Sequence, residues 1–336
     1  MRPAFFLILG LFSAGYVRAQ QGSLSGPVEG YTFDAPTRSV RAVIGFPGAA
    51  SFGPALRDSL DFASIAPRQN YGLGFQSGQS LFISGLGSAA LSARMIAGIE
   101  AEPDNIVWSG DGSVAILYSR SGNWLQIVSG FPGAPVAGSR VDGSALNGVI
   151  NTVAIDAQGK RIAAGISGDA GAVYQSSDGQ TFTLLGSLAK PVALSFSSDG
   201  GTLYALDGGA LQVIAMDWNS HASQTISLGG LASPVAIQSV QDSQNSRLLY
   251  VADASARLVR VIDVSSQQIV TDVPLGFAPN RLDQFGTNSF VAASRAQATN
   301  PLWLFTNMPQ PAAYFVPAVK LHRPTHRMPA IVRGAR

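Results

Sequence analysis

Two similar stretches that begin 43 residues apart constrain the fold of this chain most strongly. The first runs from Pro191 to Tyr204, and the second runs from Pro234 to Asp253. Each consists of a short apolar strand, a polar turn and a second apolar strand. Self-similarity at this period is typical of propellers and solenoids, in which each repeat buries its apolar faces against its neighbours. The sequence therefore predicts a repeat fold.

Polar turns recur along most of the chain and align the repeats. Asp-Gly pairs and Asn residues between apolar runs predict tight hairpins, because such turns need residues that tolerate a positive φ. An apolar segment follows each turn, and usually a third and a weaker, more polar fourth. Four strands in a unit of about 40–45 residues are the pattern of a propeller blade. The aligned turns are residues 75–78, 108–112, 155–159, 196–200, 241–245 and 285–288.

The start of the chain contains a seventh repeat unit, which lacks the first turn by which the others are aligned. Tyr31–Arg41 matches Tyr250–Arg260 without a gap, at a constant offset of 219 residues. This match predicts that the chain enters the ring at the second strand of a blade, so that the inner strand of that blade must come from elsewhere. Ala330–Val332 is the one late apolar run that could supply it. We expect an all-β fold, a β-propeller of seven four-stranded blades, with six blades as the alternative.

The first 19 residues have the pattern of a secretory signal peptide. Arg2 is followed by an apolar run from Ala4 to Ala14, and Val17-Arg18-Ala19 fits the small-x-small pattern that precedes cleavage. The apolar run is shorter than the roughly 20 residues that a membrane-spanning helix needs. We therefore expect cleavage after Ala19, a secreted or periplasmic location and no transmembrane segment in the mature chain.

Charge is distributed unevenly along the chain. Residues 20–318, which we expect to form a single propeller domain, contain 15 basic and 20 acidic side chains. Residues 319–336 contain five basic side chains and no acidic one, and we expect this basic tail to be disordered. The net charge of +2 is therefore no footprint of specific nucleic-acid binding. The chain has no Cys, so no disulfide can stabilise it and its core alone must do so. We also expect a monomer.

One stretch resembles a known repeat family. Tyr250–Asp253 followed by Val259–Asp263 is similar to the Tyr-Val-Thr-Asn (YVTN) β-propeller repeat, although Asp253 stands where the family has Asn. Phe196–Tyr204 is similar to the first hairpin of that repeat, with Ser198 at the usual place of Pro. The resemblance implies a propeller that is often exported and often serves as a surface or binding scaffold. A related group includes lactone hydrolases and amine-dehydrogenase subunits, so the fold alone does not select a function.

Catalytic side chains are scarce. His221 is the one His of the propeller region, and the sequence places it in a turn at the rim. His322 and His326 have the i, i+4 spacing of helical metal ligands, but Pro324 between them disfavours a helix. Without Cys, a nucleophile–base pair would have to be built on His221 alone. We therefore expect no cofactor and no metal site.

Carboxylate and guanidinium groups are the remaining candidates for a site. We expect Asp34, Asp207 and Asp253 near the ends of second strands, with Arg120 and Arg295 at comparable positions in other blades. Together they would line one loop face and bind a cation or polar ligand. The alternative is that each Asp accepts main-chain N–H bonds within its own turn.

These observations favour a non-enzymatic function. We expect an exported propeller that acts as a binding or scaffold module through one loop face, for an unknown protein, polymer or small ligand. The alternative is a lactonase-like propeller hydrolase that uses carboxylates and a metal.

Overall fold

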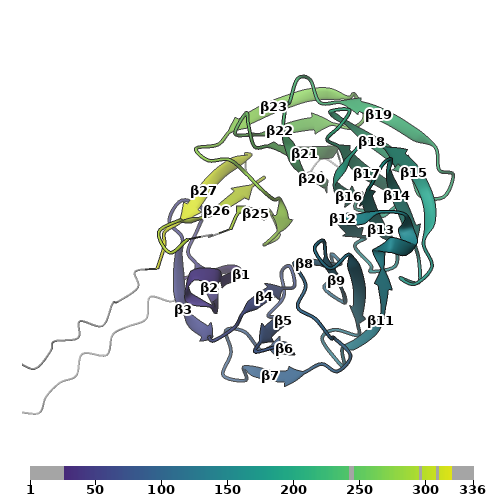
Figure 1. Ribbon diagram of the computed structural model, residues 1–336. Coiled ribbons are helices and arrows are strands. Elements are labelled where there is room, and N and C mark those ends of the chain that lie inside the picture. Colours follow the sequence, from purple (N-terminus) through teal and green to yellow (C-terminus); the bar gives the residue numbers. More distant parts are fainter. Residues whose placement is uncertain (1–25, 242–245, 295–296, 308–309, 320–336) are drawn as a thin grey trace, which may run out of the picture.

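The computed structural model describes residues 26–241, 246–294, 297–307 and 310–319. Its strands form seven antiparallel sheets that stand around a central axis as the blades of a β-propeller (Figure 1). The predicted fold class and blade number are confirmed. The signal peptide, the basic tail with His322 and His326, Arg295 and the candidate closing strand Ala330–Val332 all lie outside the described residues.

The seven blades, A to G, follow one another in chain order. Blade A contains β1 (Val28–Asp34), the 3-10 helix η1 (Ala35–Thr37), β2 (Ser39–Ile44) and β3 (Ser51–Arg57). Blade B contains β4 (Phe62–Ile65), β5 (Tyr71–Gln76), β6 (Gln79–Ser84) and β7 (Ser92–Met95). Blade C contains β8 (Asn105–Trp108), β9 (Val114–Ser119), β10 (Trp124–Ser129), β11 (Val136–Asp142) and the 3-10 helix η2 (Gly143–Leu146). Blade D contains β12 (Val149–Ile155), β13 (Ile162–Ser167), β14 (Gly171–Ser176) and β15 (Thr183–Leu188).

The last three blades have the same plan. Blade E contains β16 (Pro191–Phe196), β17 (Thr202–Asp207), β18 (Gln212–Asp217) and β19 (Ser223–Ser227). Blade F contains β20 (Pro234–Gln241), β21 (Arg247–Asp253), β22 (Leu258–Asp263) and β23 (Gln268–Pro274). Blade G contains β24 (Asp283–Gln284), β25 (Ser289–Ala293), β26 (Leu302–Thr306) and β27 (Ala312–Val316). In each four-stranded blade the first strand is innermost and the fourth forms the outer rim (Figure 1).

The hairpin between the first and second strands repeats its local chemistry. Gly112, Gly159 and Gly200 all adopt a positive φ in these turns, as their sequence positions predict. The carboxylate of Asp199 accepts hydrogen bonds from the Ser197 hydroxyl (2.6 Å) and the Gly201 N–H (2.9 Å). The side chain therefore fixes the turn and leaves the flanking strands free to pair.

One sequence alignment of these turns is wrong. We aligned residues 75–78 with the first turns of the other repeats, but in blade B they join β5 to β6, which are its second and third strands. Ser77 and Gly78 have a positive φ there (51° and 77°), so the second hairpin uses the same turn residues as the first. The turn signal alone cannot distinguish the two hairpins.

Apolar side chains fill the spaces between neighbouring blades. The cluster between blades B and C contains Leu73, Phe82, Leu117 and Trp124, all of them buried. Full burial of such a side chain contributes about 1.5–3 kcal/mol. Because every blade uses both faces in this way, the stability of the ring depends on each neighbouring pair of blades.

Blade A differs from the other six because its described part has three strands. Phe33 pairs with Val40 as Ala252 pairs with Val259, which reproduces the offset of 219 residues in the register of the two sheets. β1 is therefore a second strand, as the sequence match predicts. Blades A and G lie side by side and bring the two ends of the described chain together (Figure 1).

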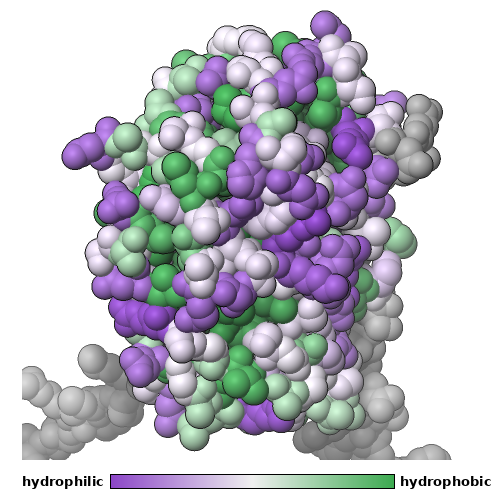
Figure 2. Space-filling view, turned by 90° about the vertical axis from the view of Figure 1, so that its right-hand side faces the viewer, coloured by the Kyte–Doolittle hydropathy of each residue, from purple (hydrophilic) through white to green (hydrophobic). Residues whose placement is uncertain are grey.

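The outer rim is mixed in character. Viewed from the side that holds β15, hydrophilic and hydrophobic residues are interspersed over the surface (Figure 2). Exposed apolar residues such as Leu184 and Val136 occur on outer strands, and single residues of this kind are normal on protein surfaces. No helix in the described part of the chain has the length and apolar character that a membrane crossing requires.

Candidate functional site

One face of the ring holds the predicted site residues. We call it the link face, because it carries the links between blades and the turns from the second to the third strand of each blade. Asp34, Asp207 and Asp253 are the last residues of β1, β17 and β21, and Arg120 follows β9 directly. All four therefore lie on the link face, each in a different blade. Arg295 is outside the described part of the chain.

Asp207 connects its own turn to the link that enters its blade. Its carboxylate accepts main-chain N–H bonds from Ala189 and Lys190 in the link, at 2.8 and 2.9 Å. It also accepts N–H bonds from Gly209 and Ala210 in the turn, at 2.9 and 3.2 Å. Burial raises the pKa of this carboxyl, but the N–H donors outweigh burial, so the net pKa is lowered. The ionised side chain therefore joins the link to the turn, and we call this arrangement the link–turn clasp.

Asp253 forms the same clasp in blade F. It accepts the Ser233 N–H from the link (2.8 Å), and the Ala256 N–H (2.8 Å) and the Ser255 hydroxyl (2.9 Å) from its own turn. In blade A, Asp34 accepts the hydroxyl of Thr37 at 2.6 Å. All three carboxylates are buried, at 0–2 % exposure. Asp207 and Asp253 accept N–H bonds from their own turns, as the turn alternative predicts, and from the entering links as well. Ligand binding by these residues stays a prediction.

Blade C has the same clasp with the roles reversed: the link provides the carboxylate, and the turn provides the N–H donors. Its second strand ends in Ser119, and Asp104 in the entering link provides the carboxylate. Asp104 accepts N–H bonds from Arg120 (2.8 Å) and Ser121 (3.1 Å). Burial raises the pKa of Asp104, whereas these bonds and the Ser hydroxyls lower it, and the net shift is downward. Sequence reasoning missed Asp104, because alignment of strand ends does not search the links.

Arg120 is exposed, unlike the other three members of the predicted set that the structure describes. Its neighbour Tyr118 has a pKa that burial raises and that Arg120 lowers. Two charges of blade G also affect this phenol: Asp283 raises its pKa, and Arg281 lowers it. Blades C and G are not adjacent, so this electrostatic influence acts across the ring. The sequence did not indicate that blade G would contribute there.

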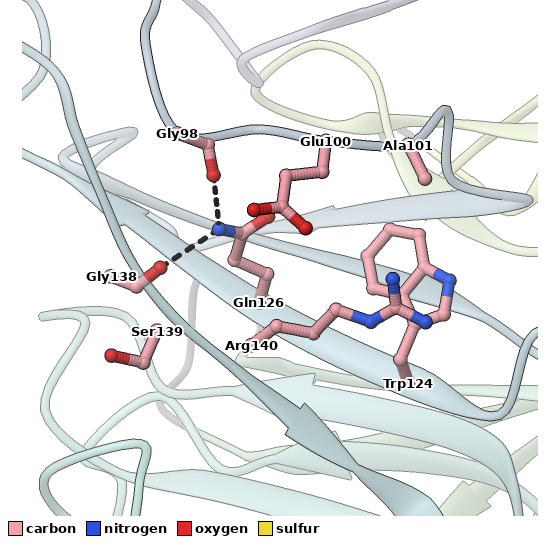
Figure 3. A pocket seen from close by; sticks show the side chains of 8 residues that line it. All are labelled: Gly98, Glu100, Ala101, Trp124, Gln126, Gly138, Ser139 and Arg140. Carbon is pink, nitrogen blue, oxygen red and sulfur yellow. Dashed lines mark hydrogen bonds between the residues drawn. The ribbon is translucent and has the colours of Figure 1, made fainter.

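A pocket of about 120 Å³ lies where the link between blades B and C crosses the outer half of blade C (Figure 3). Its lining comes from three places: the link, β10 and β11. The lining residues are Gly98, Glu100, Ala101, Trp124, Gln126, Gly138, Ser139 and Arg140. Pockets for drug-sized ligands enclose about 300–1,000 Å³, so this one has room for a group the size of a side chain.

Gln126 holds the walls of the pocket together. Its amide nitrogen donates to the carbonyl oxygens of Gly98 (2.7 Å) and Gly138 (2.8 Å), one on each wall (Figure 3). The β10–β11 register shifts between Gln126 and Val128, which marks a β-bulge. A bulge redirects the strand locally, and here it opens space beside Gln126. Because both N–H donors of the buried amide are used, its carbonyl oxygen is the atom it can offer to a ligand.

Two opposite charges stand at this pocket. The guanidinium of Arg140 lies over the ring of Trp124, 4.7 Å from the centroid, and this cation–π contact fixes its position. Glu100 extends from the link toward Gln126 in the view of Figure 3 and is exposed. Glu100 forms no ion pair with any residue in the described part of the chain. The pocket therefore presents acceptors from Glu100 and Gln126 and a donor from Arg140.

Sequence reasoning did not find this pocket. Glu100 and Arg140 are separated by a whole blade in sequence, and the bulge that brings Gly138 beside Gln126 has no turn residue to indicate it. His221 lies at the rim as predicted, in a turn with φ 61°, and its Nε2 is 2.9 Å from the amide nitrogen of Gln175. Within the described ranges, no three His, Asp or Glu side chains gather as metal ligands would.

The comparisons with known proteins identify the fold. No protein-family model matches the chain, and no curated protein sequence matches it. A functionally unknown protein from Desulfotomaculum acetoxidans DSM 771 is similar in structure, with 12% identity and a TM-score of 0.59 over 86% of this chain and 99% of that one. Hsv2 from Kluyvelomyces marxianus is similar with 10% identity and a TM-score of 0.55, over 87% of this chain and 97% of that one. At these identities the likeness shows the propeller fold alone.

Proposed function

We propose that this chain is an exported, non-enzymatic β-propeller of the YVTN repeat type that binds a partner through its link face. The repeat assignment rests on Tyr250–Asp253 and Val259–Asp263, which lie in the adjacent strands β21 and β22. Export rests on the signal pattern of residues 1–19. The binding role rests on the pocket between blades B and C.

The chemistry of that pocket favours a neutral amide. Glu100 and the Gln126 carbonyl oxygen can accept the two N–H bonds of a primary amide, and Arg140 can donate to its oxygen. A cation would be repelled by Arg140, and an anion would be repelled by Glu100. The volume of about 120 Å³ suits the end of a side chain. The pocket therefore takes an Asn or Gln side chain from a partner protein, with Arg120 as a further contact on the same face.

Binding of small probes tests the proposal directly. N-acetylglutamine methylamide should shift the NMR resonances of the Trp124 indole, whereas butylammonium and butyrate should shift them less. Glu100→Gln and Arg140→Gln should each weaken amide binding about tenfold, since one hydrogen bond to a charged group is lost. Glu102→Gln is the matched control, because this exposed carboxylate does not line the pocket. Equal binding of all three probes, or no effect of Glu100→Gln, would contradict the proposal.

Export and the absence of catalysis have separate tests. The secreted or periplasmic protein should begin at Gln20 on N-terminal sequencing, and an intact Met1 would overturn the export proposal. Purified protein should show no turnover of lactone, ester or glycoside substrates. Turnover that disappears on changing one link-face residue would replace the binding role with the hydrolase alternative.

A further inference from the structure

The inner edge of β1 carries no partner strand in the described part of the chain, whereas the second strand of every other blade pairs with an inner first strand. In blade F, β20 pairs with β21 from Pro234 opposite Asp253 to Gln241 opposite Arg247. β1 occupies the place of β21, with Asp34 equivalent to Asp253 and Val28 equivalent to Arg247. No described strand pairs with β1 on the side toward the ring axis. An open strand edge is a template for another strand.

A pocket of about 310 Å³ lies beside the first half of this edge, where it is lined by Val28–Tyr31. Its lining comes from β1, from the first hairpin of blade B and from the end of β24 in blade G. These flanking elements adjoin the inner strands of the two neighbouring blades, so the pocket lies where the second half of an inner strand of blade A would lie. Ile65, Ala66 and Phe285 give it apolar walls on both sides.

We propose that this edge is a strand-acceptor site and that its occupant is residues 329–336 of the same chain. These residues read Pro-Ala-Ile-Val-Arg-Gly-Ala-Arg. The inner strands β16 and β20 begin Pro191-Val-Ala-Leu and Pro234-Val-Ala-Ile, so a Pro followed by apolar residues opens each of them. A Pro suits the first residue of a strand, because its missing N–H costs no ladder hydrogen bond.

The chain direction brings this segment to the correct end of the site. β27 is the outer strand of blade G, and after Val316 the chain emerges on the link face. Between blades E and F, the same step leads from β19 to Pro234, which pairs with Asp253. A segment that follows β27 would likewise meet β1 first at Asp34 and run antiparallel to it. Residues 317–328 supply the link.

Blade F also predicts the register. When Pro329 takes the place of Pro234, Ile331 corresponds to Ala236 and Val332 to Ile237, both of which are buried apolar residues. Since Ala236 pairs with Ala252 and Ile237 with Val251, Ile331 should pair with Phe33 and Val332 with Thr32. Arg333 and Arg336 then replace Gln238 and Gln241, so polar residues replace polar ones.

Disulfide trapping tests both the occupant and the register, because the chain has no natural Cys. We would oxidise two double variants, Thr32→Cys/Val332→Cys and Phe33→Cys/Ile331→Cys. Adjacent antiparallel pairs alternate between wide and close spacing, so one of the two should cross-link readily. The control is Phe33→Cys/Val332→Cys, which a one-residue slip places on opposite faces of the sheet. Mass spectrometry should find the link within one chain, several-fold more abundant than in the control.

A second measurement tests the site when cross-linking is ambiguous. Full-length protein without residues 329–336 should melt lower by more than about 4 °C, and a synthetic peptide of those eight residues should restore the melting temperature. Cross-links found only between two chains would overturn the proposal and make a second copy the occupant. Failure of both double variants to exceed the control, with unchanged melting of the truncated protein, would also overturn it.

Discussion

The phenolic hydroxyl of Tyr314 donates a 2.7 Å hydrogen bond to Oε2 of Glu29. Glu29 lies on β1, and Tyr314 lies on β27 of the last blade. This bond therefore joins the first and last sheets across the seam where the ring closes. The Tyr314 side chain is buried among apolar residues of blades A and G, including Val43 and Leu304. Closure thus combines apolar packing with one polar contact.

Tyr314→Phe should destabilise the folded protein. The variant keeps the ring packing but leaves the Glu29 carboxylate without its phenol donor, and a hydrogen bond to a charged group contributes about 1.5–3 kcal/mol. Chemical denaturation would measure the loss. Tyr174→Phe is the control, because Tyr174 in blade D is partly buried against a core cluster, and its hydroxyl has no hydrogen bond to another described residue. Equal losses in the two variants would refute a role for the Glu29 bond in closure.

The same bond predicts sensitivity to alkali. Burial raises the pKa of Tyr314, and the bond to the Glu29 carboxylate raises it further. A raised folded-state pKa means that the stabilisation is complete below the usual Tyr pKa of about 10 and is lost as the pH rises above it. The melting temperature of the native protein should therefore fall above pH 10, and the fall should be shallower in Tyr314→Phe. An identical slope in both proteins would contradict this assignment.

Asp207→Asn tests the clasp between links and turns. The amide has one acceptor oxygen in place of two, so the N–H groups of Ala189 and Lys190 compete with those of the turn. We expect a loss of about 1.5–3 kcal/mol in the free energy of unfolding. Asp169→Asn, at an exposed site in blade D, should change stability by less than about 0.5 kcal/mol.

Acid should remove the stabilisation that Asp207 provides. Its net pKa is lowered in the folded protein, so the stabilisation is present above the unfolded-state pKa of about 3.9 and is lost as the pH falls toward the folded-state value. Thermal melts from pH 6 to pH 2 should show a smaller decline for Asp207→Asn than for the native protein. A decline of the same size would show that Asp207 does not titrate in this range.

The sequence predicted the parts of this fold that depend on local chemistry. Turn glycines such as Gly200 and the match of Tyr31–Arg41 with Tyr250–Arg260 specify hairpins and register, because a tight turn and an alternating strand need particular residues at fixed spacing. The link-face position of Asp207 and Asp253 followed from the same alignment. Their burial did not, because a carboxylate at the end of a strand can point to solvent or into a clasp.

The site between blades B and C depends on long-range geometry. Asp104 and Glu100 lie in a link without regular periodicity, and Arg140 lies beyond a bulge. Pairing across a bulge shifts which side chains become neighbours, so residue spacing alone cannot bring Arg140 beside Trp124. Repeat patterns therefore find blades and turns, whereas links and bulges must be seen in the structure.

Arg260→Lys should destabilise blade F. Arg260 is 9 % exposed, and its Nε and Nη2 bond both carboxylate oxygens of Asp272, at 2.7 and 2.6 Å. Its Nη1 donates to the carbonyl oxygens of Leu228 (2.5 Å) and Gly229 (2.8 Å). Lys cannot form this fork, and because the Asp272 carboxylate is about one-third exposed, we expect a loss of about 1.5–3 kcal/mol, as for a hydrogen bond to a charged group.

Denaturant titration would measure that loss. Arg247→Lys is the matched control, since its ion pair with Asp199 is about half exposed on both sides and such pairs contribute about 0–1 kcal/mol. A loss below about 1 kcal/mol for Arg260→Lys would show that the blade repacks around the shorter side chain.

Gln126→Leu should separate the structure of the blade B–C pocket from its binding chemistry. Leu fills a similar volume but leaves the carbonyl oxygens of Gly98 and Gly138 without the amide donor, at a cost of about 1–3 kcal/mol for each buried unsatisfied group. The link should then exchange amide hydrogens faster, and amide binding should be lost together with that order. Gln180→Leu is the control, because Gln180 also donates to a β11 carbonyl, that of Ser139 (3.1 Å), but from an exposed position. If Gln126→Leu leaves hydrogen exchange of residues 98–101 unchanged, the link is held by its apolar contacts, and the pocket does not depend on Gln126.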